Sequence, residues 1–243
     1  MSRRRIHRLC CVITLTAVLV PVATVLAPAV ADEPDAYAAD ENERFDLVVR
    51  EDIFAGFDGD AKRLARGLAK CEEALAKNPE HAEAMVWRGA IRMFQSNVLF
   101  NKGKQAEGFS LFSSGVTDMN KAKELAPHSV AVMIPRAAVL INAGRSAPPL
   151  IGRPLLEAVR EDFESTYERQ KDVLDQIGEH PLGELRMGLA DIYRLLDQKD
   201  KSKQQLEALL KELPDTEYAE RATKWLAAKP DAKLAHNCLG CHE

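Results

Sequence analysis

The sequence has few of the alternating β-branched and aromatic runs that form β-strands. Ala, Leu, Glu, Lys and Arg dominate it instead, and apolar residues recur at spacings of three and four. These residue types favour helices, and this spacing places apolar side chains on one helical face. We therefore expect an all-α chain.

Cysteine is scarce as well, with five in 243 residues. Cys10 and Cys11 lie in the apolar N-terminal segment, so the remaining cysteines are Cys71, Cys238 and Cys241. An odd number in a chain of this size does not indicate a disulfide framework. Because Cys71 stands at a large-residue position of the helical pattern, we expect it to be a buried apolar thiol.

The chain has no excess of basic residues. It holds 33 Lys and Arg against 37 Asp and Glu. Four of the arginines lie before Asp32, in the segment that we predict is removed, which leaves a net charge of about −8 by formal counting. There is no basic patch with interleaved aromatic residues either. Nucleic acid is therefore not an expected partner.

Enzyme motifs are missing too. Residues 103–110 have the glycine spacing of a phosphate-binding loop, but no Lys precedes Ser110 and no strand precedes the segment. Asp58-Gly59-Asp60 is too short for a calcium loop and would cap a following helix. Nothing resembles a nucleophile with its base or an H-E-x-x-H pattern. We expect no catalytic residues.

Residues 1–31 have the features of a cleaved export signal: a basic region, an apolar stretch over residues 9–26 and an A-x-A cleavage site before Asp32. A retained membrane helix is the alternative, because the stretch is close to the length of a span. Pro21 and Pro28 favour cleavage. We predict a bacterial Sec signal peptide, a periplasmic or secreted mature protein, and no permanent membrane span.

The remaining chain contains an internal repeat. Residues 78–91 align with residues 126–139 at an offset of 48, with Pro, Met, Arg and Ala at matching positions. The residues upstream keep the same order of small, large, small and Pro. These are Gly67, Cys71, Ala74 and Pro79 in the first copy and Gly115, Met119, Ala122 and Pro127 in the second. The order predicts one helix that ends in a turn.

These segments resemble the tetratricopeptide repeat (TPR), a pair of antiparallel helices of about 34 residues. The clearest match is residues 183–216. Its matching positions are Leu189, Ala190 and Tyr193 in the first helix, Leu206 and Leu209 in the second, and the closing Pro214. The resemblance implies stacked helix pairs with a surface that binds other exported proteins.

The sequence departs from the TPR pattern in three ways. Arg88 and Arg136 stand where Leu is usual, and Pro135 would start its helix late or kink it. The offset of 48 also implies an insertion of about 14 residues relative to the usual repeat. We place it within residues 96–112, as extensions of both helices.

We expect an all-α, TPR-like array of about nine helices over residues 32–229. The longest loop should span residues 145–154, which contain three prolines, and a capping helix should span residues 217–228. Turns are predicted near residues 56–59, 78–79, 102–103, 126–127, 144–149, 179–181, 198–200 and 213–215.

A tail over residues 230–243 carries the one sequence pattern that indicates a specific chemical function. Cys238-Leu239-Gly240-Cys241-His242 is the C-x-x-C-H pattern by which haem is bonded covalently to protein. Thiols three residues apart share one face of a helical turn, where they can add to the two vinyl groups of haem. We predict haem c bound through Cys238 and Cys241, with His242 as the ligand of the iron.

Other interpretations of the motif remain open. The two thiols can form a disulfide, or they can bind metal with His236 and His242, although this spacing strains a tetrahedral zinc site. A peroxidase or gas-binding haem protein would need an enclosed pocket. Cytochromes of the c-prime type also carry the motif near their C-terminus, but in their last bundle helix.

The sixth position of the iron would be filled from the array only if the tail folds back onto it. The candidates are Met85, Met93, Met119, Met133 and Met187, with His81, His128 and His180. Each is otherwise expected to be a core methionine or a surface histidine, and Trp87 and Trp225 to be packing or groove aromatics.

The sequence thus predicts an exported TPR-like scaffold with one haem at its C-terminus, for electron transfer with a partner protein. The alternative is the same scaffold without haem, used in protein interaction or assembly.

Overall fold

The computed structural model describes residues 44–229 together with Ala232 and Leu234. These residues form nine α-helices and no strand, which confirms the predicted all-α array of helix pairs. The helices are α1 (Phe45–Phe57), α2 (Ala61–Lys77), α3 (Ala82–Asn101), α4 (Gln105–Leu125), α5 (Val130–Ser146), α6 (Pro149–Gln170), α7 (Glu179–Leu195), α8 (Lys199–Glu212) and α9 (Glu217–Leu226).

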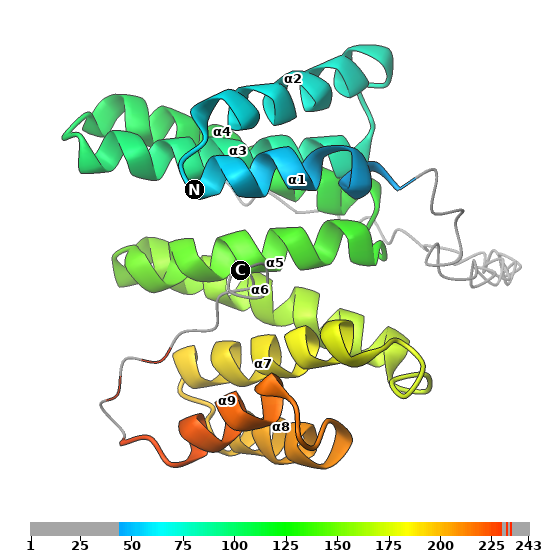
Figure 1. Ribbon diagram of the computed structural model, residues 1–243. Helices are drawn as coiled ribbons and strands as arrows, with labels where there is room; N and C mark the ends of the chain where they lie inside the picture. The colour runs from blue at the N-terminus through cyan, green and yellow to red at the C-terminus, as the bar shows by residue number, and fades with distance from the viewer. Residues whose placement is uncertain (1–43, 230–231, 233, 235–243) are drawn as a thin grey trace, which may run out of the picture. The chain divides into compact units, whose positions relative to one another are not determined.

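Consecutive helices pack as antiparallel pairs, α1 with α2, α3 with α4, α5 with α6 and α7 with α8, and α9 lies against α8 (Figure 1). The first helices of successive pairs also touch one another, α1 with α3, α3 with α5 and α5 with α7. The four pairs therefore stack in the order of the sequence. Among the described helices, none has the length and apolar character needed to cross a membrane.

Small residues let the two helices of a pair approach closely. A methyl group built on Gly89 of α3 would lie 2.9 Å from the backbone oxygen of Gly115 in α4. In the next pair, one built on Gly152 of α6 would lie 2.4 Å from the oxygen of Gly144 in α5. Real Cβ atoms do not come this close to backbone oxygens, so these crossings require glycine.

In each of the pairs α3–α4, α5–α6 and α7–α8, an arginine on the first helix forms an ion pair with a carboxylate on the second helix. Arg88 of α3 contacts both carboxylate oxygens of Asp118 in α4 at 2.8 Å. The corresponding contacts are Arg136 with Asp162 and Arg186 with Glu212. The arginines that depart from the TPR pattern are thus internal ion pairs of their own repeats.

The first pair reverses this arrangement. Its acid, Asp52, lies on α1, and Arg63, Arg66 and Lys70 of α2 all bind it. These three basic side chains are partly exposed, whereas the arginine and carboxylate of the α5–α6 pair are both buried. The hydrogen bonds from Arg66, Arg63 and Lys70 hold the pKa of Asp52 well below its usual range.

Two predictions about the loops are wrong. Residues 145–154 are almost entirely helical, because Pro149 stands at the first position of α6, where a missing N–H costs nothing, and Pro154 follows inside that helix. The longest connection between described helices is instead residues 171–178. It ends at Gly178, whose φ of 87° favours glycine, and α7 then begins at Glu179, where a turn was expected.

The other helix boundaries follow the predicted pattern closely. Helices α3 and α4 have 20 and 21 residues, against 17 and 14 for α7 and α8, so both are extended as predicted. Helix α5 begins at Val130, five residues before Pro135, so Pro135 does not delay its start. The capping helix is α9, which ends at Leu226.

Candidate functional site

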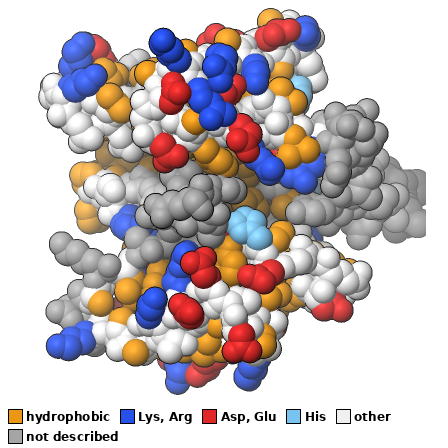
Figure 2. Space-filling model, viewed as in Figure 1, with side chains coloured by type: hydrophobic (Ala, Val, Ile, Leu, Met, Phe, Trp, Pro, Cys, Tyr) orange, Lys and Arg blue, Asp and Glu red, His pale blue; other side chains and the backbone are white. Residues whose placement is uncertain are grey.

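A groove of about 1120 Å³ runs along the first helices of the four pairs. Its walls come from α1, α3, α5 and α7, with the start of α4 and parts of α6. Figure 2 shows hydrophobic side chains in the hollow between the upper and lower helices, while charged side chains cover the outer surfaces. The groove is therefore the concave, apolar face of the stack, of the kind by which helical repeats bind ligands.

One end of the groove is aromatic. We call it the aromatic end and define it by Phe57 of α1, Phe94 and Phe100 of α3, and Phe109 and Phe112 of α4. The rings of Phe57 and Phe94 lie 4.8 Å apart between centroids, and those of Phe100 and Phe109 lie 5.3 Å apart. Phe109 is 53% exposed, so this end presents a large apolar surface that the described residues leave uncovered.

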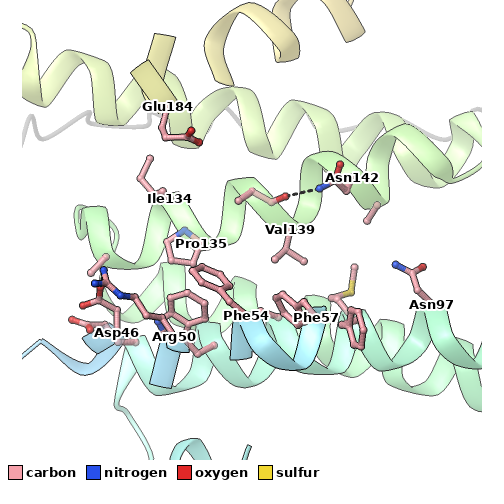
Figure 3. A pocket seen from close by; sticks show the side chains of 18 of the residues that line it. Asp46, Arg50, Phe54, Phe57, Asn97, Ile134, Pro135, Val139, Asn142 and Glu184 are labelled. Atoms are coloured by element: carbon pink, nitrogen blue, oxygen red, sulfur yellow. Dashed lines mark hydrogen bonds and ion pairs between the residues drawn. The ribbon is translucent and has the colours of Figure 1, made fainter. Parts of the chain in front are cut away.

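The opposite side of the aromatic end is formed by α5. Figure 3 shows Val139 pointing across the groove toward Phe57, with Asn97 and Asn142 beyond them at the same end. Asn142 donates a hydrogen bond to the carbonyl of Ala138, one turn earlier in α5. The aromatic end thus combines an apolar wall of aromatic rings with two amide side chains.

The other end of the groove is charged. It lies at the N-terminal ends of α1 and α3. This charged end contains Asp46 and Arg50 of α1 and Glu83 of α3 (Figure 3 labels the first two). Burial and the neighbouring Asp46 raise the pKa of Glu83. Trp87, one turn further along α3, is 6% exposed and also lines the groove.

Two buried polar atoms in this region lack a hydrogen-bond partner within the described part of the chain. They are one carboxylate oxygen of Glu83 and the indole nitrogen of Trp87. A buried donor or acceptor without a partner costs about 1–3 kcal/mol. Both residues line the charged end of the groove.

Beyond α9 the chain is fixed to the array at Leu234. Its carbonyl accepts a hydrogen bond of 2.8 Å from Arg194, in the last turn of α7, and its side chain packs on the cluster that includes Trp225. The same nitrogen of Arg194 binds Asp191, which also pairs with Arg145 of α5. Leu234 is therefore connected to the end of α5 that borders the aromatic end.

The predicted haem ligands Cys238, Cys241 and His242 lie outside the described residues, as do His236 and the predicted signal peptide over residues 1–31. The structure accordingly describes neither the motif nor the leader. It contains no cluster of three or more His, Cys, Asp or Glu side chains able to hold a metal ion among the residues that it does describe.

The methionine candidates for the sixth ligand of the iron lie in the core, as predicted, and the histidine candidates lie outside it. All five methionines named above are buried, and of these only Met93 lines the groove. His81 accepts a hydrogen bond from the N–H of Ala84 and so caps α3, while His128 is exposed. His180 lies at the start of α7, where its ring nitrogen is 2.8 Å from the hydroxyl of Tyr218.

Cys71 is fully buried, as predicted, and burial raises the pKa of its thiol to about 12. It is therefore neither nucleophilic nor ionised at neutral pH. Trp225 lies in the cap beneath Arg194, whose guanidinium is 5.7 Å from the indole centroid.

No family model, no curated protein and no solved structure matches this chain.

Proposed function

We propose that this protein is an exported, TPR-like scaffold that carries one covalently bound haem c at its C-terminus and exchanges electrons with a partner protein held by its groove. The haem is bound through the thiols of Cys238 and Cys241, and His242 ligates the iron. When bound, haem supplies reversible one-electron chemistry, which the 20 common side chains do poorly.

The observation that carries the proposal is the groove itself. A stack of helices that served only as a spacer would have no reason to leave several phenylalanine side chains along one continuous concave surface. The groove of about 1120 Å³ exceeds the usual range for small-molecule pockets, about 300–1,000 Å³. It is large enough for a polypeptide segment or a large cofactor.

Other described features of the protein also support a role in binding. Side chains with strongly shifted pKa values, such as Asp52 and Cys71, lie away from the groove. Asp52 is held by ion pairs, and Cys71 is buried between helices. No nucleophile with an adjacent base lines the groove within the described residues. Electron transfer needs no such group, because it requires only a haem close to its partner.

The test is a haem stain on a denaturing gel, with protein purified from a host that attaches haem. We expect the wild type to stain, and Cys241→Ala to lose the stain without loss of helicity. Cys71→Ala is the matched control, because it removes a cysteine outside the motif and should stain normally. An unstained wild type with two thiols free to alkylate would contradict the proposal. It would favour the scaffold that acts without haem.

A further inference from the structure

We infer that the aromatic end of the groove encloses this protein's own haem, carried there by the C-terminal segment 235–243, and that the charged end is left to the partner. This inference rests on the proposed function, since it needs a haem at Cys238 and Cys241. It adds a site for the haem that the C-x-x-C-H motif does not specify.

The first support is where the segment starts. Leu234 is fixed to the C-terminal end of α7 by Arg194. From Arg194 a continuous series of polar contacts leads through Asp191 and Arg145 to Asn142, with Arg145 and Asn142 joined at 3.1 Å. Asn142 lines the aromatic end. The haem-bearing segment therefore leaves the array beside this end of the groove.

The second support is the length of chain available. Cys238 is four residues after Leu234, so it lies within about 14 Å of it even when the chain is fully extended. The charged end is further away, because α5 alone extends about 20 Å from Asn142 back to Ser129 at a rise of 1.5 Å per residue. The segment therefore starts nearer to the aromatic end of the groove than to the charged end.

The third support is the chemistry of the walls. Haem is a flat, largely apolar ring system, and the aromatic end presents aromatic rings on one side and Val139 on the other. Burial of its faces there would remove apolar surface from water at about 25 cal/mol per Å². Asn97 and Asn142 supply donors for the polar edge. The residues of this end therefore fit the group.

Attachment of haem to the two thiols needs no oxidant or reductant. Each thiol of Cys238 and Cys241 would add across one vinyl double bond of haem, so that sulfur bonds to one carbon and the thiol proton passes to the other. Two C–S bonds would form in this way and no atom would be lost. The aromatic end would act after this addition, by shielding the attached haem from water.

The experiment compares two tryptophan substitutions in haem-loaded, full-length protein. Val139→Trp fills the aromatic end, and Leu150→Trp, at a side chain that is 90% exposed, is the matched control. Haem content is measured by the gel stain. Enclosure is measured by the circular dichroism of the haem Soret band, which arises when an asymmetric wall surrounds the ring.

We expect all three proteins to stain equally. The wild type and Leu150→Trp should give a strong Soret signal, and Val139→Trp should lose most of it. If Val139→Trp does not fold, Asn97→Trp, at an exposed position of the same end, replaces it. Stained proteins with the same Soret signal in the wild type and the filled variants would overturn the inference and leave the proposed function standing. An unstained wild type would overturn both.

Discussion

The interiors of the helix pairs and the groove between them are built differently. Inside a pair, helices touch through glycines, and a buried arginine meets a carboxylate, as with Arg136 and Asp162. The groove has neither feature at its aromatic end, where half-buried rings such as Phe57 and Phe94 line open space. The comparison teaches that the fold is specified within the pairs, and that the first helices keep one face available for a ligand.

The largest expected effect comes from breaking a pair interior. Asp162→Ala would leave the buried Arg136 without its carboxylate, which typically costs about 3–5 kcal/mol. The free energy of unfolding in urea measures this loss. The matched control is Glu124→Ala, which removes an exposed pair with Lys121 and should cost less than about 1 kcal/mol. Equal losses in the two variants would mean that the buried pair does not hold α5 to α6.

A smaller loss should follow from a methyl group at a helix crossing. Gly89→Ala would gain about 1 kcal/mol from helix propensity, but its methyl group would press on the backbone of Gly115, and overpacking costs about 1–3 kcal/mol. We therefore expect a net loss of up to about 2 kcal/mol in thermal unfolding. Ser113→Ala, at an exposed position of α4, is the control. A stabilised Gly89→Ala would show that α3 and α4 can separate freely.

The first pair should differ from the others in its response to pH. The pKa of Asp52 is lowered by Arg66, Arg63 and Lys70, so its contribution to stability is complete above about pH 4. It is lost as the pH falls below that value toward the folded pKa. The stability gap between wild type and Asp52→Asn should therefore be wider at pH 7 than at pH 3 in urea titrations. A gap of equal width at both pH values would contradict this account of the α1–α2 contact.

The smallest effect on stability should come from the groove. Phe109→Ala removes a ring that is 53% exposed, so unfolding should change by no more than about 0.5 kcal/mol. The same change should weaken the Soret dichroism of the haem-loaded protein, because it removes part of the aromatic wall. A large loss of stability without any change in the Soret signal would contradict this difference between the pairs and the groove. It would mean that Phe109 stabilises the contact between helices, as residues inside the pairs do.

The helices could largely be predicted from the sequence, because their signals are local. Proline follows the end of α2 at Pro79 and of α4 at Pro127, and small residues such as Gly67 and Gly115 mark the crossings. The loop over residues 145–154 was predicted wrongly because Pro149 stands where a helix tolerates proline. The true long connection, residues 171–178, contains no proline to mark it.

The site could not be predicted in the same way, because it depends on stacking. Phe57, Phe94 and Phe109 come from three helices and share no spacing in the sequence. Arg88 pairs with an acid 30 residues later, whereas the partner of Arg136 is 26 residues later, so a constant offset does not reveal these contacts. The anchor of Leu234 uses its backbone carbonyl, which any residue offers.

The central claim is that this scaffold carries a haem, and the intact mass of the exported protein tests it most directly. The protein should be isolated from a host with haem-attachment machinery and measured after denaturation. The account predicts a chain that begins at Asp32 and is heavier by one haem, and a Cys238→Ala/Cys241→Ala variant that lacks this increment. A wild-type mass equal to that of the bare chain would contradict it.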